Sequence, residues 1–191
     1  MRLILMGPPG AGKGTQAVGL AERIDGVHIS TGDIFRANVA EQTELGKKAQ
    51  EFMDAGKYVP DEITNAMVRD RLGQADAASF VLDGYPRTAD QVDELDDILA
   101  GLGAKLDGVI SIVVPDREEL VQRMIKRAET SGRADDTEEV IRHRQDVYDS
   151  ETAALVPLYS ARGLVHEVDG VGTIDEVATR IGAAVDAISR G

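Results

Sequence analysis

A glycine-rich segment that carries one lysine is the part of this sequence best suited to chemistry. Residues 7–15 are Gly-Pro-Pro-Gly-Ala-Gly-Lys-Gly-Thr. Glycines let the backbone turn tightly enough for several N–H groups to converge on one anion, and Lys13 adds a full positive charge. The apolar run at 2–6 predicts a buried strand before this loop, and the stretch at 16–24 predicts an amphipathic helix after it. Because a helix N-terminus attracts anions, the segment is typical of a phosphate cradle and indicates a protein that handles a nucleoside triphosphate.

One position of this loop departs from the general phosphate-loop pattern. That pattern places Ser or Thr directly after Gly-Lys, where its hydroxyl binds magnesium. Here Gly14 stands in that place, and Thr15 supplies the first hydroxyl. Direct ligation of magnesium by a loop side chain is therefore left open. Asp83 ends an apolar run at 79–83, and its carboxylate either holds magnesium through water or caps the loop that follows.

The composition is that of one soluble globular domain, with 191 residues, 42% hydrophobic and 29% charged. No cysteine is present, which excludes disulfides and cysteine-based zinc sites, and the three histidines lack ligand spacing. No apolar run approaches the roughly 18 residues of a membrane span, and the first residues lack a secretory pattern. We therefore expect a cytoplasmic protein.

The net charge of −13 argues against nucleic acid or an anionic membrane as a partner, because both favour basic surfaces. A phosphate-binding protein of this charge needs a concentrated cationic cleft. The basic residues are 15 arginines and 6 lysines, and arginine suits fork-like recognition of phosphate oxygens.

Strand-like and helix-like segments alternate along the chain, without internal repeats or long linkers. The run at 109–114 is β-branched and continuous, as in strands buried on both faces of a parallel sheet. Asp116 and Glu119 predict a capping box for a helix that ends near 128, and a polar hinge follows at 129–132. The alternation predicts a doubly wound α/β domain with helices on both faces of the sheet. Strands are expected at 2–6, 27–29, 79–83, 109–114 and 164–168; helices are expected at 16–24, 34–40 (with its start at 30–33), 44–55, 61–72, 89–102, 116–128, from about 136 to a bend or break near Pro157, and at 174–189.

Two arginines lie where no local acid explains them. Arg144 has only apolar or aromatic neighbours at i±3 and i±4, and Arg127 has Arg123 at i−4 and no acid at these spacings. Such charges require an anion from elsewhere in the structure, either a substrate phosphate or a distant carboxylate. Arg123 has Glu119 at i−4, so an ion pair and a functional role both stay open. Arg142 has acids at i−4, i−3 and i+4, which favours a surface ion pair.

Taken together, these motifs closely resemble the adenylate kinase family of nucleoside monophosphate kinases. They run through nearly the whole chain in the order found in the family. The segments that carry the resemblance are 7–15, 29–36 (Ile-Ser-Thr-Gly-Asp-Ile-Phe-Arg), 57–60 (Lys-Tyr-Val-Pro) and 83–88 (Asp-Gly-Tyr-Pro-Arg-Thr) with Gln91, Arg123, Arg127, Arg133 and Arg144. Tyr85 replaces the phenylalanine that is usual in the family, and we expect its ring to keep the same packing.

The resemblance implies a P-loop kinase fold in three layers around a five-stranded parallel sheet, and transfer of the terminal phosphoryl group of ATP to AMP. ATP, AMP, ADP and Mg²⁺ are the implied ligands, in a monomer without zinc. It implies catalytic roles for Lys13, Arg87, Arg123, Arg127, Arg133 and Arg144. It implies that ATP is bound by Gly10, Ala11, Gly12, Lys13, Gly14, Thr15, Arg127 and, less specifically, Gly172, and that magnesium meets Asp83 through water. It implies that AMP is bound by Thr31, Arg36, Lys57, Tyr58, Val59, Gly84, Tyr85, Pro86, Arg87, Gln91, Arg133 and Arg144.

The same resemblance divides the single domain into a core and two smaller parts. The core is expected at about 1–29, 60–126 and 135–191, and a helical monophosphate-binding lobe at about 30–59. Only five residues separate Arg127 from Arg133, where long-lid relatives insert a small domain, so a short lid is expected at about 127–134.

Two alternatives to an adenylate kinase remain at this point. The first is a uridylate/cytidylate kinase of the same fold, but such relatives tend to lack Thr31 and Gln91, whose side chains suit adenine. The second is a nucleotide-binding module without transferase activity, which would not need a second arginine-rich anion site. A GTPase is disfavoured, because neither Asn38 nor Asn65 begins the Asn-Lys-x-Asp guanine motif.

Overall fold

The computed structural model describes residues 1–131 and 137–190. Within these residues, five parallel strands form one sheet, as expected, and their order is β2-β3-β1-β4-β5. Arg133 lies outside the described residues, with the rest of 132–134, the last part of the expected short lid. The strands are β1 (Arg2–Met6), β2 (Val27–Ser30), β3 (Phe80–Asp83), β4 (Gly108–Val113) and β5 (Val165–Asp169).

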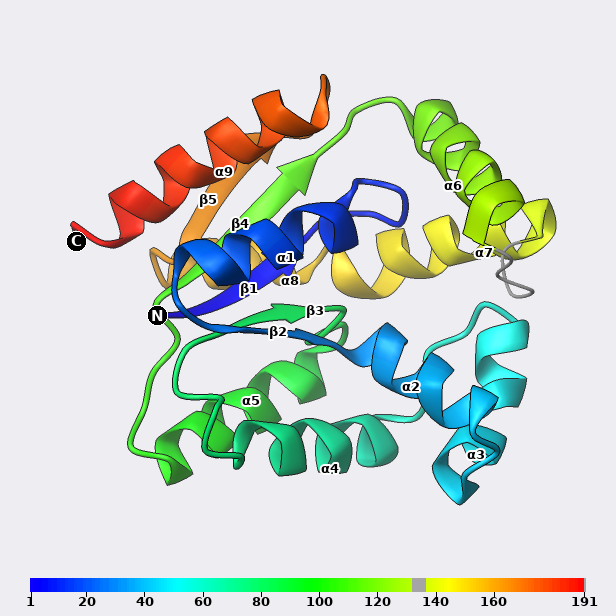
Figure 1. The fold of residues 1–191 in the computed structure, drawn as a ribbon, viewed down its shortest axis with the longest axis horizontal. Helices are drawn as coiled ribbons and strands as arrows, with labels where there is room; N and C mark the ends of the chain where they lie inside the picture. Colours follow the sequence, from blue (N-terminus) through cyan, green and yellow to red (C-terminus); the bar gives the residue numbers. More distant parts are fainter. Residues whose placement is uncertain (132–136, 191) are drawn as a thin grey trace.

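Helices cover both faces of this sheet, so the domain has three layers (Figure 1). Buried side chains of α4, α5 and α8 pack on one face, and those of α1 and α9 pack on the other. No helix of the described ranges is long and apolar enough to cross a membrane. The helices are α1 (Lys13–Arg23), α2 (Thr31–Ala40), α3 (Glu44–Asp54), α4 (Asp61–Leu72), α5 (Ala89–Gly101), α6 (Arg117–Ser131), α7 (Glu138–Val147), the π-helix η1 (Tyr148–Thr152), α8 (Leu155–Ala161) and α9 (Ile174–Ile188).

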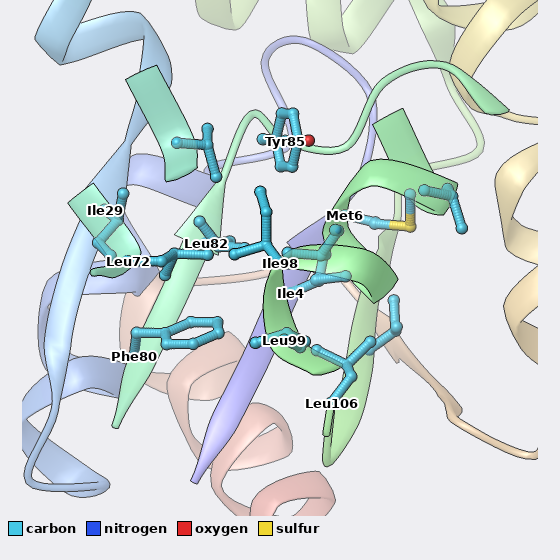
Figure 2. Close-up of a cluster of buried hydrophobic side chains, with 14 of the residues drawn as sticks. Ile4, Met6, Ile29, Leu72, Phe80, Leu82, Tyr85, Ile98, Leu99 and Leu106 are labelled. Atoms are coloured by element: carbon cyan, nitrogen blue, oxygen red, sulfur yellow. The ribbon is translucent and has the colours of Figure 1, made fainter. Parts of the chain in front are cut away.

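The apolar strands explain why the sheet is buried on both faces. Successive side chains of a strand point to opposite faces, so Leu3 and Leu5 join the cluster under α1 and α9, whereas Ile4 and Met6 join the one under α4 and α5. Figure 2 shows this second cluster, in which Phe80 and Leu82 of β3 meet Leu99 and its neighbours on α5. The same burial on both faces accounts for the β-branched run of β4.

The strand register brings distant segments together at the carboxyl edge of the sheet. Leu5 of β1 and Ser30 of β2 both pair with Asp83 of β3, and Met6 pairs with Ser111 of β4. The phosphate loop, the start of α2 and the segment after β3 therefore leave the sheet side by side. In Figure 1 the strand arrows point towards the side of the molecule where α2, α3, α6 and α7 lie. Open α/β sheets bind ligands at this edge.

The helices α2 and α3 form a small unit with its own apolar cluster. Phe35 of α2, Ala49 of α3 and Val59 after α3 are buried together. Ile63 and Met67 of α4 pack against the same cluster, so it continues onto the core. Thr43 caps α3 by accepting a hydrogen bond from the Gly46 backbone N–H at 3.0 Å, which fixes the tight turn between the two helices.

Two expectations about the second half of the chain were wrong in detail. The helix expected to end near 128 runs to Ser131, through most of the expected hinge. Asp116 does cap it, by accepting from the Glu119 backbone N–H at 3.2 Å, but the Glu119 side chain pairs with Arg123 instead of completing a capping box. That reciprocal geometry occurs at Thr173 and Glu176, before α9.

The interruption expected near Pro157 is present, between α7 and α8. Pro157 lies in the first turn of α8, where its missing N–H does no harm, and the irregular part is upstream, in the π-helix η1. The π-helical turn closes with a hydrogen bond from the Ala153 N–H to the Tyr148 carbonyl, at 2.9 Å.

Candidate nucleotide-binding cleft

A cleft of about 900 Å³ opens at the carboxyl edge of the sheet, and most of the predicted site residues line it. The exceptions are Ala11, which is buried in the core and whose N–H donates to the Pro8 carbonyl at 3.1 Å, and Arg133, which lies outside the described residues. The predicted residues of the triphosphate end that line the cleft are Gly10, Gly12, Lys13, Gly14, Thr15, Arg123, Arg127 and Gly172. Those of the monophosphate end are Thr31, Arg36, Lys57, Tyr58, Val59, Gly84, Tyr85, Pro86, Arg87, Gln91 and Arg144.

The phosphate loop owes its shape to glycines that no other residue can replace without strain. Gly10 has φ +86°, and a Cβ there would lie 2.5 Å from the carbonyl oxygen of Leu120 on α6. Gly12, with φ +90°, is the N-cap of α1 and supplies no capping side chain, and the first turn of α1 holds no acidic residue. The N–H groups and positive dipole end of α1 are therefore available to an anion.

Lys13 begins α1 and turns back over the loop. Its Nζ donates to the carbonyl oxygens of Gly7 at 2.7 Å and of the next residue at 3.1 Å. The pKa of Lys13 is lowered to about 8, chiefly by burial; the charges of Arg87 and Arg127 contribute to the lowering, and Asp83 opposes it. Cations from β3, α6 and the phosphate loop thus converge, an arrangement that an anionic ligand would stabilise.

Asp83 places a carboxylate beside this cluster of cations. Burial acts to raise its pKa, but the imidazole of His28, whose Nε2 is 3.7 Å from Asp83 Oδ2, and the charges of Lys13 and Arg87 prevail, so the pKa lies below its ordinary value. A Cβ at Gly14 would lie 3.8 Å from Asp83 Oδ2, which puts the carboxylate next to the start of α1. An ionised carboxylate beside a phosphate cradle fits Mg²⁺, which is bound through one or two carboxylates, waters and substrate phosphates.

The start of α2 forms one wall of the monophosphate end. Thr31 is buried, and its Oγ1 donates to the Gly84 carbonyl at 3.0 Å. Ser30 is the N-cap of α2 and accepts from the Asp33 N–H at 3.2 Å, so the expected helix start is confirmed. The carboxylate of Asp33 is paired with Arg36 at 2.5 Å, which presents the Arg36 guanidinium on the cleft wall.

Gln91 and Arg87 are held by a network that includes an acid the sequence analysis did not single out. The Gln91 amide accepts from the Arg87 N–H at 2.7 Å and donates to Asp61 Oδ1 at 2.7 Å. Thr88 donates to the other Asp61 oxygen at 2.6 Å, and Arg87 Nε donates to the Gly84 carbonyl at 2.7 Å. An amide has two N–H groups and two lone pairs, so Gln91 keeps one of each for a ligand.

The floor of this end is apolar. The ring of Tyr85 is 1% exposed, and its hydroxyl donates to Asn65 Oδ1 at 2.9 Å, which gives the phenol a partner. Val59 is buried in the cluster under α2 and α3, whereas Lys57 is exposed at the rim. Flat apolar surface of this kind suits a nucleobase.

The arginines of α6 and α7 reach the cleft in different ways. Arg123 is paired with Glu119 and also donates to the Gly170 carbonyl at 3.3 Å, so it forms the ion pair that the sequence left open and also lines the cleft. Arg144 reaches from α7 across to α3, where its Nη2 lies 3.4 Å from the Met53 carbonyl oxygen. This contact spans the mouth of the cleft between the α2–α3 unit and the core.

Arg142 confirms the expectation of a surface ion pair. It is bound to Glu138 at 2.9 Å on its own helix and to Glu118 of α6 at 3.2 Å. The pairing with Glu118 could not be predicted from the sequence, because it depends on how α6 and α7 pack. The pair holds the two arginine-bearing helices together away from the cleft.

Sequence reasoning also missed residues that support the site. Gln145 is buried, and its Nε2 donates to the Pro9 carbonyl at 2.8 Å, which fixes α7 against the phosphate loop. Tyr148 and Thr152 of η1 line the cleft, as does Lys126 of α6. The position of Lys126 beside Arg127 was a usable signal, because it extends the basic stretch of α6. Tyr148 and Thr152 of η1 carried no such signal in the sequence.

Comparisons with known proteins agree with this geometry. The family model described as adenylate kinase matches residues 5–164. An adenylate kinase of Nocardioides sp. is 58% identical over 189 residues, covering 98% of both chains. One from Renibacterium salmoninarum is 56% identical over 188 residues (98% of this chain, 97% of the relative), and one from Thermobifida fusca is 58% identical over 181 residues (94% and 95%). The chain belongs to the adenylate kinase family.

Proposed function

We propose that the cleft performs the reaction of this adenylate kinase family member, the reversible transfer of the terminal phosphoryl group of ATP to AMP, by holding the two nucleotides with their phosphates facing each other. The observation that carries the proposal is the convergence of Lys13, Arg87 and Arg127 in one cleft, where each of the two arginines lowers the pKa of the lysine. Like charges brought together in this way are stabilised when phosphates lie between them.

ATP is assigned to the end formed by the phosphate loop. The N–H groups of residues 10–15 and the N-terminus of α1 would hold its phosphates, with Lys13 on the outer ones. Arg123 and Arg127 face the same region from α6, and the turn at Gly172 lies where the adenine would rest. Ala11 would contribute through the loop backbone only, because its side chain is buried in the core.

AMP is assigned to the end formed by α2, the turn at 57–59 and the segment at 84–91. Arg36, Arg87 and Arg144 would hold its phosphate, and we propose the same role for Arg133. Thr31 and the uncommitted N–H and lone pair of Gln91 would read the adenine edge. These two residues favour AMP over UMP or CMP, because a pyrimidine presents a different pattern of donors and acceptors.

Transfer between two bound nucleotides requires alignment and charge stabilisation, with little covalent chemistry from the protein. The arginines of α6, α7 and the segment after β3 would surround the transferred group, and arginines in such positions are worth about 10³–10⁵-fold in comparable systems. Adenylate kinases use Mg²⁺ with ATP, and Asp83 is the residue that would hold it through water. Bound there, the ion would neutralise charge on the ATP phosphates.

The domain division follows from this assignment. We propose that the α2–α3 unit is a monophosphate-binding lobe that closes over AMP and that residues 127–134 are a short lid over ATP. Closure would exclude water and so suppress hydrolysis of ATP. One chain supplies all of the proposed residues, so a monomer suffices, and the net charge of −13 disfavours nucleic acid or an anionic membrane as partner.

The test is ADP formation from Mg-ATP with AMP, CMP, UMP or GMP as acceptor. We expect rapid ADP formation with AMP, a large loss in Lys13→Ala and Arg87→Ala, and wild-type rates in Arg142→Ala, the matched control whose arginine is bound on the surface. Gln91→Ala should reduce selectivity for AMP more than it weakens ATP binding. Equal turnover with CMP or UMP would contradict the adenine assignment, and the absence of acceptor-dependent ADP would contradict phosphoryl transfer.

A further inference from the structure

The side chain of Tyr58 makes a contact that the assignment of AMP-binding residues does not use. The guanidinium carbon of Arg87 lies 4.8 Å from the centroid of the Tyr58 ring. A cation within about 6 Å of a ring centroid is attracted to the face of the ring. Tyr58 comes from the turn after α3, and Arg87 comes from the segment after β3, so the contact joins the proposed lobe to the core.

The tyrosine ring is itself anchored. Its hydroxyl lies 2.7 Å from Oγ1 of Thr152, and Thr152 Oγ1 donates to the backbone carbonyl of Arg87 at 3.0 Å. A threonine hydroxyl has one proton, and a carbonyl can only accept, so the Tyr58 hydroxyl must be the donor to Thr152. The result is a closed circuit that leads from the Arg87 carbonyl through Thr152 and Tyr58 back to the Arg87 guanidinium.

This circuit determines which atoms of Arg87 remain for a ligand. Nε is bound to the Gly84 carbonyl at 2.7 Å, and one face of the guanidinium is against the ring. Within the described part of the chain, neither Nη atom of Arg87 donates a hydrogen bond. Arg87 lines the cleft, so both Nη atoms can bind a phosphate there, in the planar fork that binds two oxygens at once.

Thr152 brings a third element into the circuit. It is the last residue of the π-helix η1, it is buried, and it lines the same cleft. Such π-helical turns are rare and occur frequently at functional sites, because the wider turn moves a side chain from its α-helical place. Here the turn presents a hydroxyl to both Tyr58 and the Arg87 backbone.

We infer that Tyr58 is a positioning residue for Arg87: its ring, fixed by Thr152, holds the guanidinium in the orientation that receives the phosphate of the monophosphate substrate. The inference rests on the proposed function, in which Arg87 binds the AMP phosphate. Loss of the ring leaves Arg87 its charge but frees its rotamers, so binding of the acceptor suffers and binding of ATP does not.

The test compares variants in steady-state kinetics with both substrates. Tyr58→Leu should lower kcat/KM for AMP about 3- to 30-fold and leave the KM for ATP unchanged. Tyr58→Phe keeps the ring but loses its anchor, and Thr152→Val removes the same hydrogen bond together with the one to the Arg87 carbonyl. Each should cost about 2- to 5-fold, and the double variant should cost no more than Thr152→Val alone.

Two controls separate positioning from a general structural role. Tyr159 also has an arginine over its ring, Arg162 at 5.4 Å, but neither lines the cleft. Tyr159→Phe should therefore leave kcat/KM for AMP unchanged. In an Arg87→Ala background, Tyr58→Leu should change the residual kcat/KM for AMP less than 2-fold, because the residue through which it acts is gone.

Equal losses from Tyr58→Leu with and without Arg87 would overturn the inference and indicate that the ring contacts AMP or merely supports the lobe. Failure of the proposed function is recognised separately. If the wild type does not phosphorylate AMP, or if Arg87→Ala keeps the wild-type kcat/KM for AMP, the AMP assignment itself is wrong before Tyr58 is considered, and the inference falls with it.

Discussion

Replacing Lys13 with methionine should stabilise the protein without nucleotide while abolishing its response to ATP. The lysine is buried with two arginine charges nearby, a costly arrangement until phosphates arrive. Methionine keeps most of the side-chain length and removes the charge. The variant therefore separates the cost of an empty phosphate site from its benefit when filled.

The magnitude follows from the pKa. Burial lowers the pKa of Lys13 from 10.5 to about 8. Because each pH unit corresponds to about 1.4 kcal/mol, keeping this lysine charged at pH 7 costs about 3 kcal/mol. The hydrogen bonds from Nζ to two loop carbonyls, lost in the variant, offset about 1–2 kcal/mol of this. A net gain of about 1–2 kcal/mol raises the midpoint of thermal unfolding by about 2–8 °C in a chain of this length.

The dependence on pH has a definite sign. A lysine whose pKa is lower in the folded state than in the unfolded state binds fewer protons when folded, so the wild type gains stability as pH rises from about 8 to about 10.5. The variant lacks this gain. The stability difference between the two proteins should therefore be largest near pH 7 and shrink towards pH 10.

Thermal unfolding of both proteins, with and without ATP, is the assay. Without nucleotide the variant should unfold at the higher temperature, and with ATP at 100 times its Kd the wild type should gain about 2.7 kcal/mol while the variant gains nothing. A variant that is less stable than the wild type without nucleotide at pH 7, or a difference that does not depend on pH, would refute the reasoning.

Three further predictions concern other parts of the cleft. Gly10→Ala should destabilise the protein and abolish ATP binding, since its Cβ would meet the Leu120 carbonyl at 2.5 Å. Gly12→Ala has open space around its Cβ, so in thermal melts its unfolding temperature should lie closer to that of the wild type. Asp61→Asn should raise the KM for AMP several-fold and leave that for ATP unchanged, since Asp61 holds two side chains of the monophosphate end; equal changes in both constants would contradict this. Asp83→Asn should raise the Mg²⁺ concentration needed for half-maximal activity, and binding of metal-free ATP should persist; an unchanged Mg²⁺ requirement would remove Asp83 from the metal site.

Much of the fold was predictable because local signals and tertiary burial agree. The apolar runs at β1 and β4 are buried on both faces, and helix α4 has the predicted bounds, after Pro60. The predicted sheet then places the loops after β1, β2 and β3 at one edge. The candidate site could be located from the sequence for this reason.

The parts that could not be predicted depend on contacts between distant segments. Asp61 looked like an ordinary acid in the first turn of a helix, and only the packing of α4 on α5 brings it to Gln91. Glu118 and Arg142 meet across α6 and α7, 24 residues apart. The π-helical turn that presents Thr152 departs from the 3.6-residue period, and a periodicity of 3.6 does not reveal it.

The central claim is that one cleft holds ATP and AMP at the same time, in separate places. The most direct measurement is a calorimetric titration of AMP into the protein saturated with Mg²⁺ and a non-hydrolysable ATP analogue. One AMP should bind per chain with the analogue retained, and Arg87→Ala should lose the binding of AMP alone. Displacement of the analogue by AMP would show a single shared site and would rule out simultaneous binding of the two nucleotides.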